Sequence, residues 1–568
     1  MKGDNPAITP MKRFGKLLNQ EKRDVYAIYF YAVLNGGVGL ILPLAIQALF
    51  NFILGGRVST SWVILIGLVA AGFTFSGFLQ ISQLYLTEKL QQRIFTKSAL
   101  GFAYRFPRLK LDALQNKYAP ELVNRFFDSV NLQKGTAKLL LDFPTAILQV
   151  LFGLILLAFY HPYFILFGVI LILILIAIFY FTSPKGMETA LKESSAKYNV
   201  AYWLEEVARA LPSFKLSGSS KLPLLKVDYL LQSYVDFRNK HFNVLIFQYK
   251  VLIAFKVLIV TALLGVGSLL LINEEISIGQ FVAAEIVIIL VIGSVEKMIL
   301  SLETVYDTLT AVEKLGLVMD MPIEKQIGTE KSLSKNEHGL KFELNKLYFK
   351  SSNKQFNILE NINFSIDAGE KVVLTGGSGS GKSTLLHLLA GLYEDYRGKI
   401  IVNGLPLDVL DINKFRGYLG ESFNNQYIFH GTMRENITLG RDVEEPKVRK
   451  VLELVGLNNY VFSLPDDLET MLMPEGKGLS QVDIRKIIVA RCLVHNPRTL
   501  LLEDLWSLLK GEEEEIIDYI FKGEWTAIFI SEDEKLISKA DKVIELVKGR
   551  VKFVGTPAEY NEFKNGNN

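Results

Sequence analysis

The sequence of 568 residues predicts two structural parts, an α-helical bundle that crosses a membrane six times and a C-terminal α/β domain. Two observations support this division. Half of the residues are hydrophobic, and the long uninterrupted apolar runs lie before about residue 310. In the C-terminal part, short apolar runs alternate with helical patterns, as strands and helices do in α/β domains. The length also exceeds that of one ordinary domain.

The six spans are predicted from apolar segments long enough to cross a hydrocarbon core of about 30 Å as helices. The clearest of them runs from Tyr163 to Phe181 and contains no charged side chain. The others lie near residues 25–54, 61–88, 138–160, 243–272 and 279–306. Because some segments are longer than a bilayer requires, we expect their helices to continue into water. A soluble bundle of buried apolar helices is the alternative interpretation.

The distribution of basic residues predicts the orientation of the spans. Arg57 is the only Lys or Arg in the three short connections, at residues 54–61, 160–163 and 273–277. The long segments 89–138 and 185–242 contain ten and nine Lys or Arg residues. Because basic residues are enriched in cytoplasmic connections, both long segments, the N-terminus and the C-terminal half are expected in the cytoplasm.

The remaining composition limits the class of protein. The apolar stretch after Arg23 is too long for the hydrophobic region of a signal peptide, so we expect an uncleaved first span in the cell membrane, the inner one if the host has two. The single cysteine, Cys492, excludes an internal disulfide and a cysteine-cluster metal site and is expected in the core. A net charge of +3 gives no reason to expect a nucleic-acid partner.

Residues Gly376 to Thr384 read GGSGSGKST, after an apolar stretch at 371–374 and before a helical pattern at 385–390. This is the phosphate loop G-x-x-x-x-G-K-[ST] in its strand–loop–helix context. Its backbone N–H groups and the helix N-terminus attract phosphate, and a chance Gly/Ser linker is the alternative. The predicted nucleotide-binding residues are Gly376, Gly377, Ser378, Gly379, Ser380, Gly381, Lys382, Ser383 and Thr384. We expect Lys382 to reach the β- and γ-phosphates and Ser383 to bind Mg²⁺.

These patterns predict four segments. A cytoplasmic N-terminal segment covers residues 1–24, and a membrane domain with long cytoplasmic helical extensions covers 25–315. A linker at 316–340 is placed where the apolar periodicity stops. The nucleotide-binding domain then covers 341–568.

Six spans followed by a phosphate-loop domain resemble a half-transporter of the ABC exporter class, over nearly the whole chain. Leu479-Ser480 is similar to the start of the signature LSGGQ, and Ala490-Arg491 to the pair on the following helix. Further matches lie at residues 431–437, 500–504, 540–541 and 549–550. The resemblance implies a dimer in which ATP binds between one chain's phosphate loop and the other chain's signature, where Ser480 is the implied contact.

The signature departs from the family pattern, because it reads Leu479-Ser480-Gln481-Val482-Asp483. Two glycines that allow close approach of the backbone to the γ-phosphate are lost. Asp483 places a carboxylate where the family has glutamine. At a separation of about 5 Å and an effective dielectric constant of about 20, this repulsion costs roughly 3 kcal/mol per unit charge. We therefore expect the signature to bind ATP poorly.

The catalytic positions implied by the resemblance also differ. The family has Asp then Glu in its second acidic motif, whereas this chain has Glu503 and Asp504. Glu503 is the implied Mg²⁺ residue and Asp504 the implied general base. A displacement of the base by about 1 Å can reduce the rate on the order of 100-fold. Glu532 takes the place of the switch histidine, so the implied catalytic residues are Asp504 and Glu532.

Two further positions keep alternatives open. The aromatic residue that stacks on adenine in the family falls at Ser351, and a small shift would bring in Tyr348, Phe349 or Phe356. The Mg²⁺-binding glutamine of the family is assigned to Gln426, with competing positions at Asn424 and Asn425 and a weaker one at Glu421.

The resemblance and its departures together predict an ATP- and Mg²⁺-binding exporter with weak or absent hydrolysis. Its predicted partners are a second half-transporter, as a homodimer or heterodimer, membrane lipid and an unknown exported substrate. An ATP-gated regulatory module on the same fold is the alternative function. Polar residues within the spans are the only indication of cargo, and they include Gln47, Gln149 and Glu285. Glu285 is expected either to face a cavity that holds a cationic or peptide cargo, or to form an interhelical hydrogen bond or lie near the outer interface.

Overall fold

The computed structural model describes residues 9–54, 60–114, 117–325, 328–329, 338–350, 356–423, 427–503 and 513–566. The chain divides into two compact units. The helical unit contains Met1–Pro107 and Ala119–Met321, and the α/β unit contains Arg108–Tyr118 and Pro322–Asn568. The four segments predicted from the sequence, 1–24, 25–315, 316–340 and 341–568, are not tested by this division and stay predictions.

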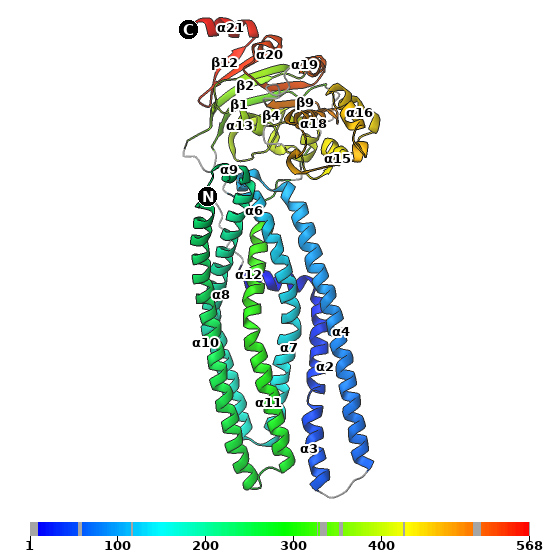
Figure 1. Cartoon of the computed structure of the whole chain (residues 1–568), viewed down its shortest axis with the longest axis vertical. Coiled ribbons are helices and arrows are strands. Elements are labelled where there is room, and N and C mark those ends of the chain that lie inside the picture. The colour runs from blue at the N-terminus through cyan, green and yellow to red at the C-terminus, as the bar shows by residue number, and fades with distance from the viewer. Residues whose placement is uncertain are drawn as a thin grey trace. The chain divides into compact units, whose positions relative to one another are not determined.

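Six candidate membrane spans lie among the described residues of the helical unit, which confirms the predicted number. They cover Lys22–Leu54, Thr60–Arg108, Ala119–Tyr160, Tyr163–Arg209, Leu222–Ile272 and Ile278–Met319 (Figure 1). The longest continuous helix, α10, has 51 residues. At about 1.5 Å per residue it is about 77 Å long, more than twice the thickness of a hydrocarbon core. The helices therefore extend well beyond a bilayer, as expected from the sequence.

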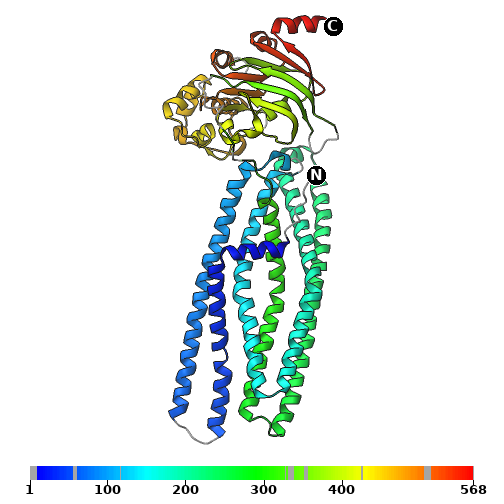
Figure 2. The ribbon, with the colours of Figure 1, turned by 180° about the vertical axis from the view of Figure 1, so that it is seen from behind.

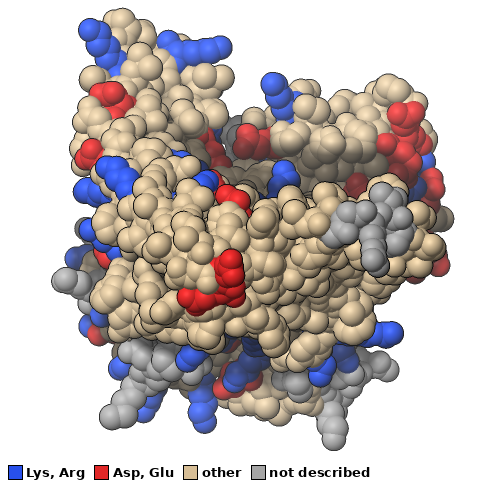
Figure 3. All heavy atoms as spheres, turned by 90° about the horizontal axis from the view of Figure 1, so that it is seen from below, with Lys and Arg blue, Asp and Glu red and all other residues tan. Residues whose placement is uncertain are grey.

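The helices of this unit include long ones and short connecting ones. The long ones are α2 (Lys22–Val38), α3 (Ile41–Leu54), α4 (Thr60–Arg105), α7 (Asp128–Tyr160), α8 (Tyr163–Arg209), α10 (Leu222–Ile272), α11 (Ile278–Leu300) and α12 (Leu302–Met319). The short ones are α1 (Pro10–Gln20), α6 (Ala119–Asn124) and α9 (Leu211–Leu216). Seen from below, most of the visible surface belongs to residues other than Lys, Arg, Asp and Glu (Figure 3).

The first span is broken at Gly39 and Leu40, between α2 and α3. Pro43 has no N–H group to donate to the carbonyl of Gly39, and the neighbouring glycines at 36 and 37 lower the helix propensity further. Non-helical backbone at membrane depth is tolerated only where protein or water covers it. In this structure Gly39 is exposed and lines a cavity of the helical unit, so its backbone is open to water or to a bound molecule there.

A helix that the sequence did not predict, α1, runs across the long helices (Figure 2) and packs on α12. Arg13 forms ion pairs with Glu313, at 3.3 Å, and with Asp320. Gly316 makes room for this guanidinium, because an added Cβ there would lie 2.1 Å from Nη1 of Arg13. The N-terminal segment is thus tied to the end of the last span.

The α/β unit contains three sheets, with strand orders β12-β11-β3-β10-β9-β6, β2-β1-β4-β5 and β7-β8. The first sheet comprises β3 (Lys371–Thr375), β6 (Leu419–Ser422), β9 (Thr499–Glu503), β10 (Thr526–Ile530), β11 (Lys542–Val547) and β12 (Arg550–Gly555). The others comprise β1 (Phe342–Phe349), β2 (Leu359–Ile366), β4 (Tyr396–Val402), β5 (Leu405–Pro406), β7 (Gly431–Thr432) and β8 (Met471–Leu472). β3, β9 and β10 are parallel and buried throughout, which explains their continuous apolar sequences.

Helices flank these strands. They are α5 (Leu111–Leu114), α13 (Lys382–Leu389), α14 (Ile412–Gly417), α15 (Met433–Thr438), α16 (Glu445–Leu454), α17 (Asn458–Phe462), α18 (Gln481–Leu493), α19 (Glu513–Lys522), α20 (Glu534–Lys539) and α21 (Pro557–Gly566). Cys492 lies buried on α18, as predicted, and burial raises the pKa of its thiol.

The segment Arg108–Tyr118 belongs to the α/β unit although it lies between two spans in the sequence. Lys110 donates its backbone N–H to the carbonyl of Pro322 at 3.1 Å and pairs through its side chain with Glu394 at 2.5 Å. Asp112 accepts the backbone N–H of Glu394 at 3.1 Å. Burial raises the pKa of the Asp112 carboxyl. These contacts connect distant parts of the sequence within one compact unit.

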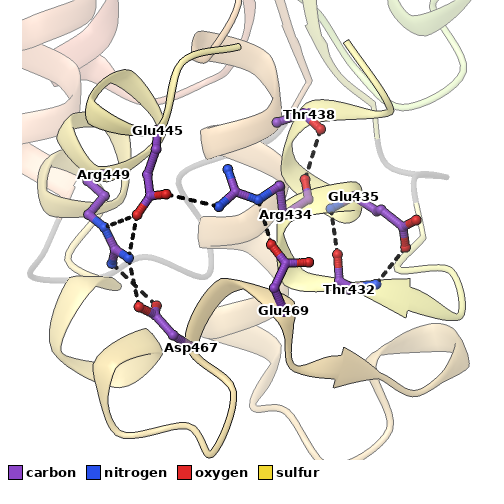
Figure 4. Close-up of polar contacts among 8 residues, drawn as sticks. All are labelled: Thr432, Arg434, Glu435, Thr438, Glu445, Arg449, Asp467 and Glu469. Atoms are coloured by element: carbon purple, nitrogen blue, oxygen red, sulfur yellow. Dashed lines mark hydrogen bonds and ion pairs between the residues drawn. The ribbon is translucent and has the colours of Figure 1, made fainter. Parts of the chain in front are cut away.

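A polar network organises the region between β7 and β8 (Figure 4). Arg434 binds Glu469 at 2.7 Å and Glu445 at 3.2 Å, while Arg449 binds Glu445 at 2.8 Å and Asp467 at 2.7 Å. Together the two arginines hold the pKa of Glu445 below its usual range. The network thus links α15, α16 and the turn before β8.

Candidate nucleotide-binding site

A cavity of about 570 Å³ lies at the phosphate loop, next to the C-terminal ends of β9 and β10. Ligands of open α/β sheets bind at the carboxyl ends of the strands. The loop residues that line it are Ser378, Gly379, Ser380, Gly381, Lys382, Ser383 and Thr384. The strand ends contribute Glu503, Ser531 and Glu532. The structure therefore brings the phosphate loop together with two of the predicted acidic residues.

Backbone geometry explains the glycines of this loop. Gly376 has a φ of 131°, and a Cβ added there would lie 2.1 Å from the carbonyl oxygen of Leu546. Gly381 has a φ of 102° and directly precedes α13. Such backbone conformations strongly favour glycine. A larger side chain at either position would therefore strain the backbone of the loop.

Lys382 folds back over the loop. Its Nζ donates to the carbonyls of Gly376 and Gly377, the latter at 3.0 Å. Burial lowers the pKa of Lys382, and the negative charges of Glu532 and Glu503 oppose this shift. The ammonium group is therefore held at the loop, close to the place where phosphates bind in this motif.

Ser383 and Glu503 meet in the same cavity, because Ser383 Oγ donates a hydrogen bond to Oε1 of Glu503. Glu503 ends β9 and is 6% exposed. A hydroxyl and a carboxylate are oxygen ligands of the kind that Mg²⁺ prefers. The residues present thus fit the predicted metal.

Glu532 lies two residues after the end of β10, is exposed, and lines the cavity near Lys382. A carboxylate there adds negative charge to the cavity near the ammonium group of Lys382.

His387 lies next to the site and was not predicted from the sequence. It lies on α13 four residues after Ser383, and its ring contacts Phe423, with centroids 4.8 Å apart. Burial lowers the pKa of His387, and Glu503 opposes that shift. The only signal in the sequence was its spacing of four from Ser383, which places both on one helix face.

At the signature position, Ser480 and Asp483 form two hydrogen bonds with each other. Ser480 caps α18 by accepting the backbone N–H of Asp483 at 3.0 Å. Its hydroxyl donates to Oδ2 of Asp483 at 2.7 Å. The hydroxyl that contacts the opposite chain's nucleotide in the family is therefore committed to a neighbouring carboxylate.

The arginine after the signature anchors this helix. Arg491 is buried and donates from Nε to the carbonyl of Asn436 at 2.8 Å. Asn436 in turn binds the backbone of Phe429 through both ends of its amide, at 3.1 and 3.0 Å. α18 is thus fixed to α15.

Several predicted positions lie outside the described residues, namely Ser351, Gln426, Asp504, Asn424 and Asn425. Of the alternatives for adenine stacking, Phe349 is 2% exposed and packs on Tyr393 in the core, whereas Phe356 is exposed. Glu421 lies on β6, where burial raises its pKa and Arg441 and Arg491 oppose the shift.

Two family models match the chain. The model described as "ABC transporter transmembrane region" matches residues 25–295, and the model described as "ABC transporter" matches residues 359–505. Each model thus matches a large part of one unit of the structure.

Individual proteins are also similar. A "putative export ATP-binding/permease protein" of Rickettsia bellii is 27% identical over 347 residues, which is 60% of each chain. The "transport/processing ATP-binding protein ComA" of Streptococcus pneumoniae is 25% identical over 88% of this chain and 70% of its own. The chain thus spans about 60% of the length of the first relative.

A solved structure shows the same fold. A bacterial Atm1-family ABC exporter with ATP bound superposes with a TM-score of 0.80 over 96% of both chains, at 18% identity. The matched models, the six spans and this fold agree. The chain therefore belongs to the ABC transporter family, as a half-transporter whose six-span membrane domain is fused to one nucleotide-binding domain on the cytoplasmic side.

Proposed function

We propose that the chain is an ATP-binding subunit of a dimeric exporter in the cell membrane that hydrolyses ATP weakly or not at all. One observation carries this proposal. The groups that bind a nucleotide, Lys382 and the Ser383–Glu503 pair, converge in one cavity, whereas the signature hydroxyl of Ser480 is committed to Asp483. These contacts thus favour nucleotide binding more than ATP hydrolysis.

On binding ATP, Lys382 exchanges the loop carbonyls of Gly376 and Gly377 for phosphate oxygens. Ser383 and Glu503 would hold Mg²⁺, which neutralises phosphate charge when bound. Glu503 carries one more methylene than the family's aspartate and already reaches Ser383 Oγ. The longer side chain therefore retains its place beside the phosphate loop.

Three residues are expected to weaken ATP hydrolysis. Asp483 repels the γ-phosphate of the ATP that binds at the opposite chain's phosphate loop. It also accepts the hydrogen bond of the Ser480 hydroxyl. Glu532 brings a second carboxylate toward the γ-phosphate on the phosphate-loop side. At the position of the general base, Asp504 is shorter than the family's glutamate. Because these groups act on one transition state, their defects reinforce one another.

The number of spans favours a dimer, and the positions of the defects determine what each composite site of that dimer contains. A single chain provides only six spans, and half a transport pathway would expose polar groups to lipid. The departures affect both the phosphate-loop side and the signature side. In a heterodimer with an intact partner, each composite site therefore still contains one class of defect, and in a homodimer each site contains all of them.

The alternative, an ATP-gated regulatory module on the exporter fold, is favoured by one observation. The Ser480–Asp483 pair opposes closure on ATP from the signature side. The relatives named above carry "export" and "transport" in their names, and this favours the exporter.

The test uses the full chain in lipid nanodiscs. We expect ATP with Mg²⁺ to raise the thermal midpoint of unfolding, particles with the mass of two chains, and phosphate release near background. Lys382→Ala is the control for site-specific binding. No stabilisation by ATP would refute nucleotide binding, and particles with one chain would refute the dimer. Brisk hydrolysis abolished by Asp504→Asn would refute weak turnover. Substrate accumulation in inverted vesicles separates the exporter from the regulatory module.

A further inference from the structure

A cavity of about 210 Å³ lies within the helical unit, beside the break between α2 and α3. Its polar lining consists of Asn35, Ser76, Gln80 and Gln149. The other lining residues are glycine or apolar, among them Phe73 and Leu290, and none carries a charge. The cavity is thus polar in one part, apolar in the rest, and uncharged.

A directed chain of hydrogen bonds orients the Asn35 amide. Gln80 Nε2 donates to Ser76 Oγ at 3.2 Å, and Ser76 Oγ donates to Oδ1 of Asn35 at 2.5 Å. Asn35 is 8% exposed. Among the described residues, its Nδ2 group donates no hydrogen bond. This nitrogen is not fully buried, so it can donate to water or to a ligand in the cavity.

Gln149 repeats this arrangement from another helix. Its Oε1 lies 2.8 Å from the hydroxyl of Ser294, which shares its one hydrogen with the carbonyl of Leu290, also at 2.8 Å, and Ser294 is 3% exposed. No hydrogen bond from Nε2 of Gln149 to any described residue is present. Two amide donors on α2 and α7 therefore line one cavity without a protein acceptor.

The helix break adds a backbone acceptor to the same lining. Gly39 lines the cavity, and Pro43 cannot supply the N–H that would normally bind the Gly39 carbonyl. Two N–H donors and one carbonyl acceptor are the complement of a peptide group. An ester or an acyl chain offers no N–H, so a lipid matches this set less well.

Resting on the proposed export function, we infer that this cavity is a subsite for one uncharged apolar residue of an exported peptide. The residue's backbone carbonyl accepts from Asn35 and Gln149, and its side chain lies against the apolar wall. The volume is below the roughly 300–1,000 Å³ of sites that enclose a whole ligand, so the cavity takes part of a longer chain. A charged residue is excluded, because the cavity supplies no counter-charge in a region of low dielectric constant.

The test measures binding of tritiated N-acetyl-trileucine amide to the full chain in phosphatidylcholine nanodiscs, with empty nanodiscs as the background. We expect saturable binding, weakened about 2- to 10-fold by Asn35→Leu and by Gln149→Leu, as loss of one neutral hydrogen bond implies. Gln47→Leu is the matched control. Gln47 is also a glutamine within a span, but it bonds to Tyr160 at 2.8 Å and does not line the cavity. Its variant should bind within twofold of the wild type.

Equal affinity in all variants, or no saturable binding, would overturn the inference. Equal binding of an analogue with ester in place of amide linkages, displaced by added short-chain lipid, would assign the cavity to lipid instead. Saturable binding of acetylated trilysine or triglutamate amide would contradict its uncharged specificity. Stabilisation by ATP is measured on the same discs. If it persists without peptide binding, only the subsite fails, whereas its absence from the wild type refutes the proposed function.

Discussion

Arg441 donates from Nη1 to Nδ1 of His495 at 2.8 Å, while the other ring nitrogen, Nε2, donates to the carbonyl of Leu419 at 2.8 Å. This arrangement satisfies both nitrogens of the neutral imidazole. A second proton would direct an N–H group at the Arg441 guanidinium. Burial, with Arg441 adding to it, lowers the pKa of His495 to about 4.

The first prediction concerns acid stability. The unfolded histidine titrates near 6.5, so the unfolded chain binds more protons between about pH 6.5 and 4. The free energy of unfolding of the α/β unit should therefore fall as the pH is lowered through this window, by about 2 kcal/mol at pH 5. His495→Gln keeps both hydrogen bonds without titrating, and in denaturant titrations it should lose correspondingly less stability. Identical pH profiles for both proteins would contradict the assignment.

The second prediction separates charge from metal binding at the phosphate loop. Lys382→Ala removes the cation that faces the phosphates, so it should abolish the thermal stabilisation by ATP. Glu503→Gln retains an oxygen ligand and a partner for Ser383, so it should only weaken that stabilisation. A ligand at 100 times its Kd stabilises by about 2.7 kcal/mol, which is readily measured. Equal loss in both variants would show that Glu503 holds the metal as firmly as the family's aspartate.

The third prediction concerns loop geometry. Gly376→Ala forces a Cβ against the carbonyl of Leu546 at a φ of 131°. Strain of this kind costs about 1–3 kcal/mol, and the contact adds to it. Gly377 is the matched control, since a Cβ there meets nothing within 4 Å. Denaturant unfolding should show a loss for Gly376→Ala and little change for Gly377→Ala, and equal losses would argue against the loop conformation.

The fourth prediction concerns the cap of α18. Ser480→Ala removes the acceptor of the Asp483 N–H, so it should destabilise the α/β unit by about 1 kcal/mol. Ser480→Asn keeps a capping acceptor and should lose much less. Phosphate release should remain near background in both variants, because the hydroxyl already serves Asp483. A large drop from a measurable rate in Ser480→Ala alone would show that the signature contacts ATP after all.

The fifth prediction concerns repair of turnover. Asp504→Glu alone should gain little, because Asp483 and Glu532 remain near the γ-phosphate. The combined variant carries Gln481→Gly, Val482→Gly, Asp483→Gln, Asp504→Glu and Glu532→His. Its rate of phosphate release should exceed the sum of the single gains by a wide margin. Additive gains would place the defects in independent steps.

Local patterns were sufficient for much of the fold and of the site. Apolar length predicted six spans, and the order of residues around Lys382 predicted the strand, loop and helix. The sequence did not predict α1, whose position depends on ion pairs from Arg13 to the distant end of α12. It also missed that Ser480 and Asp483 pair with each other, although Ser-x-x-Asp is the spacing of a helix-capping pair. The position of His387 beside the site likewise depends on a ring contact with the distant Phe423.

The membership of Arg108–Tyr118 in the α/β unit has a consequence for the order of synthesis. Lys110 and Glu394, which form an ion pair, are 284 residues apart in the sequence. At roughly 5–20 residues per second, a ribosome adds Glu394 about 15–60 s after Lys110. During that interval the spans on both sides of the segment are already made, while α5 still lacks its partners. The α/β unit therefore becomes complete only after a segment made between two membrane spans has waited for its partners.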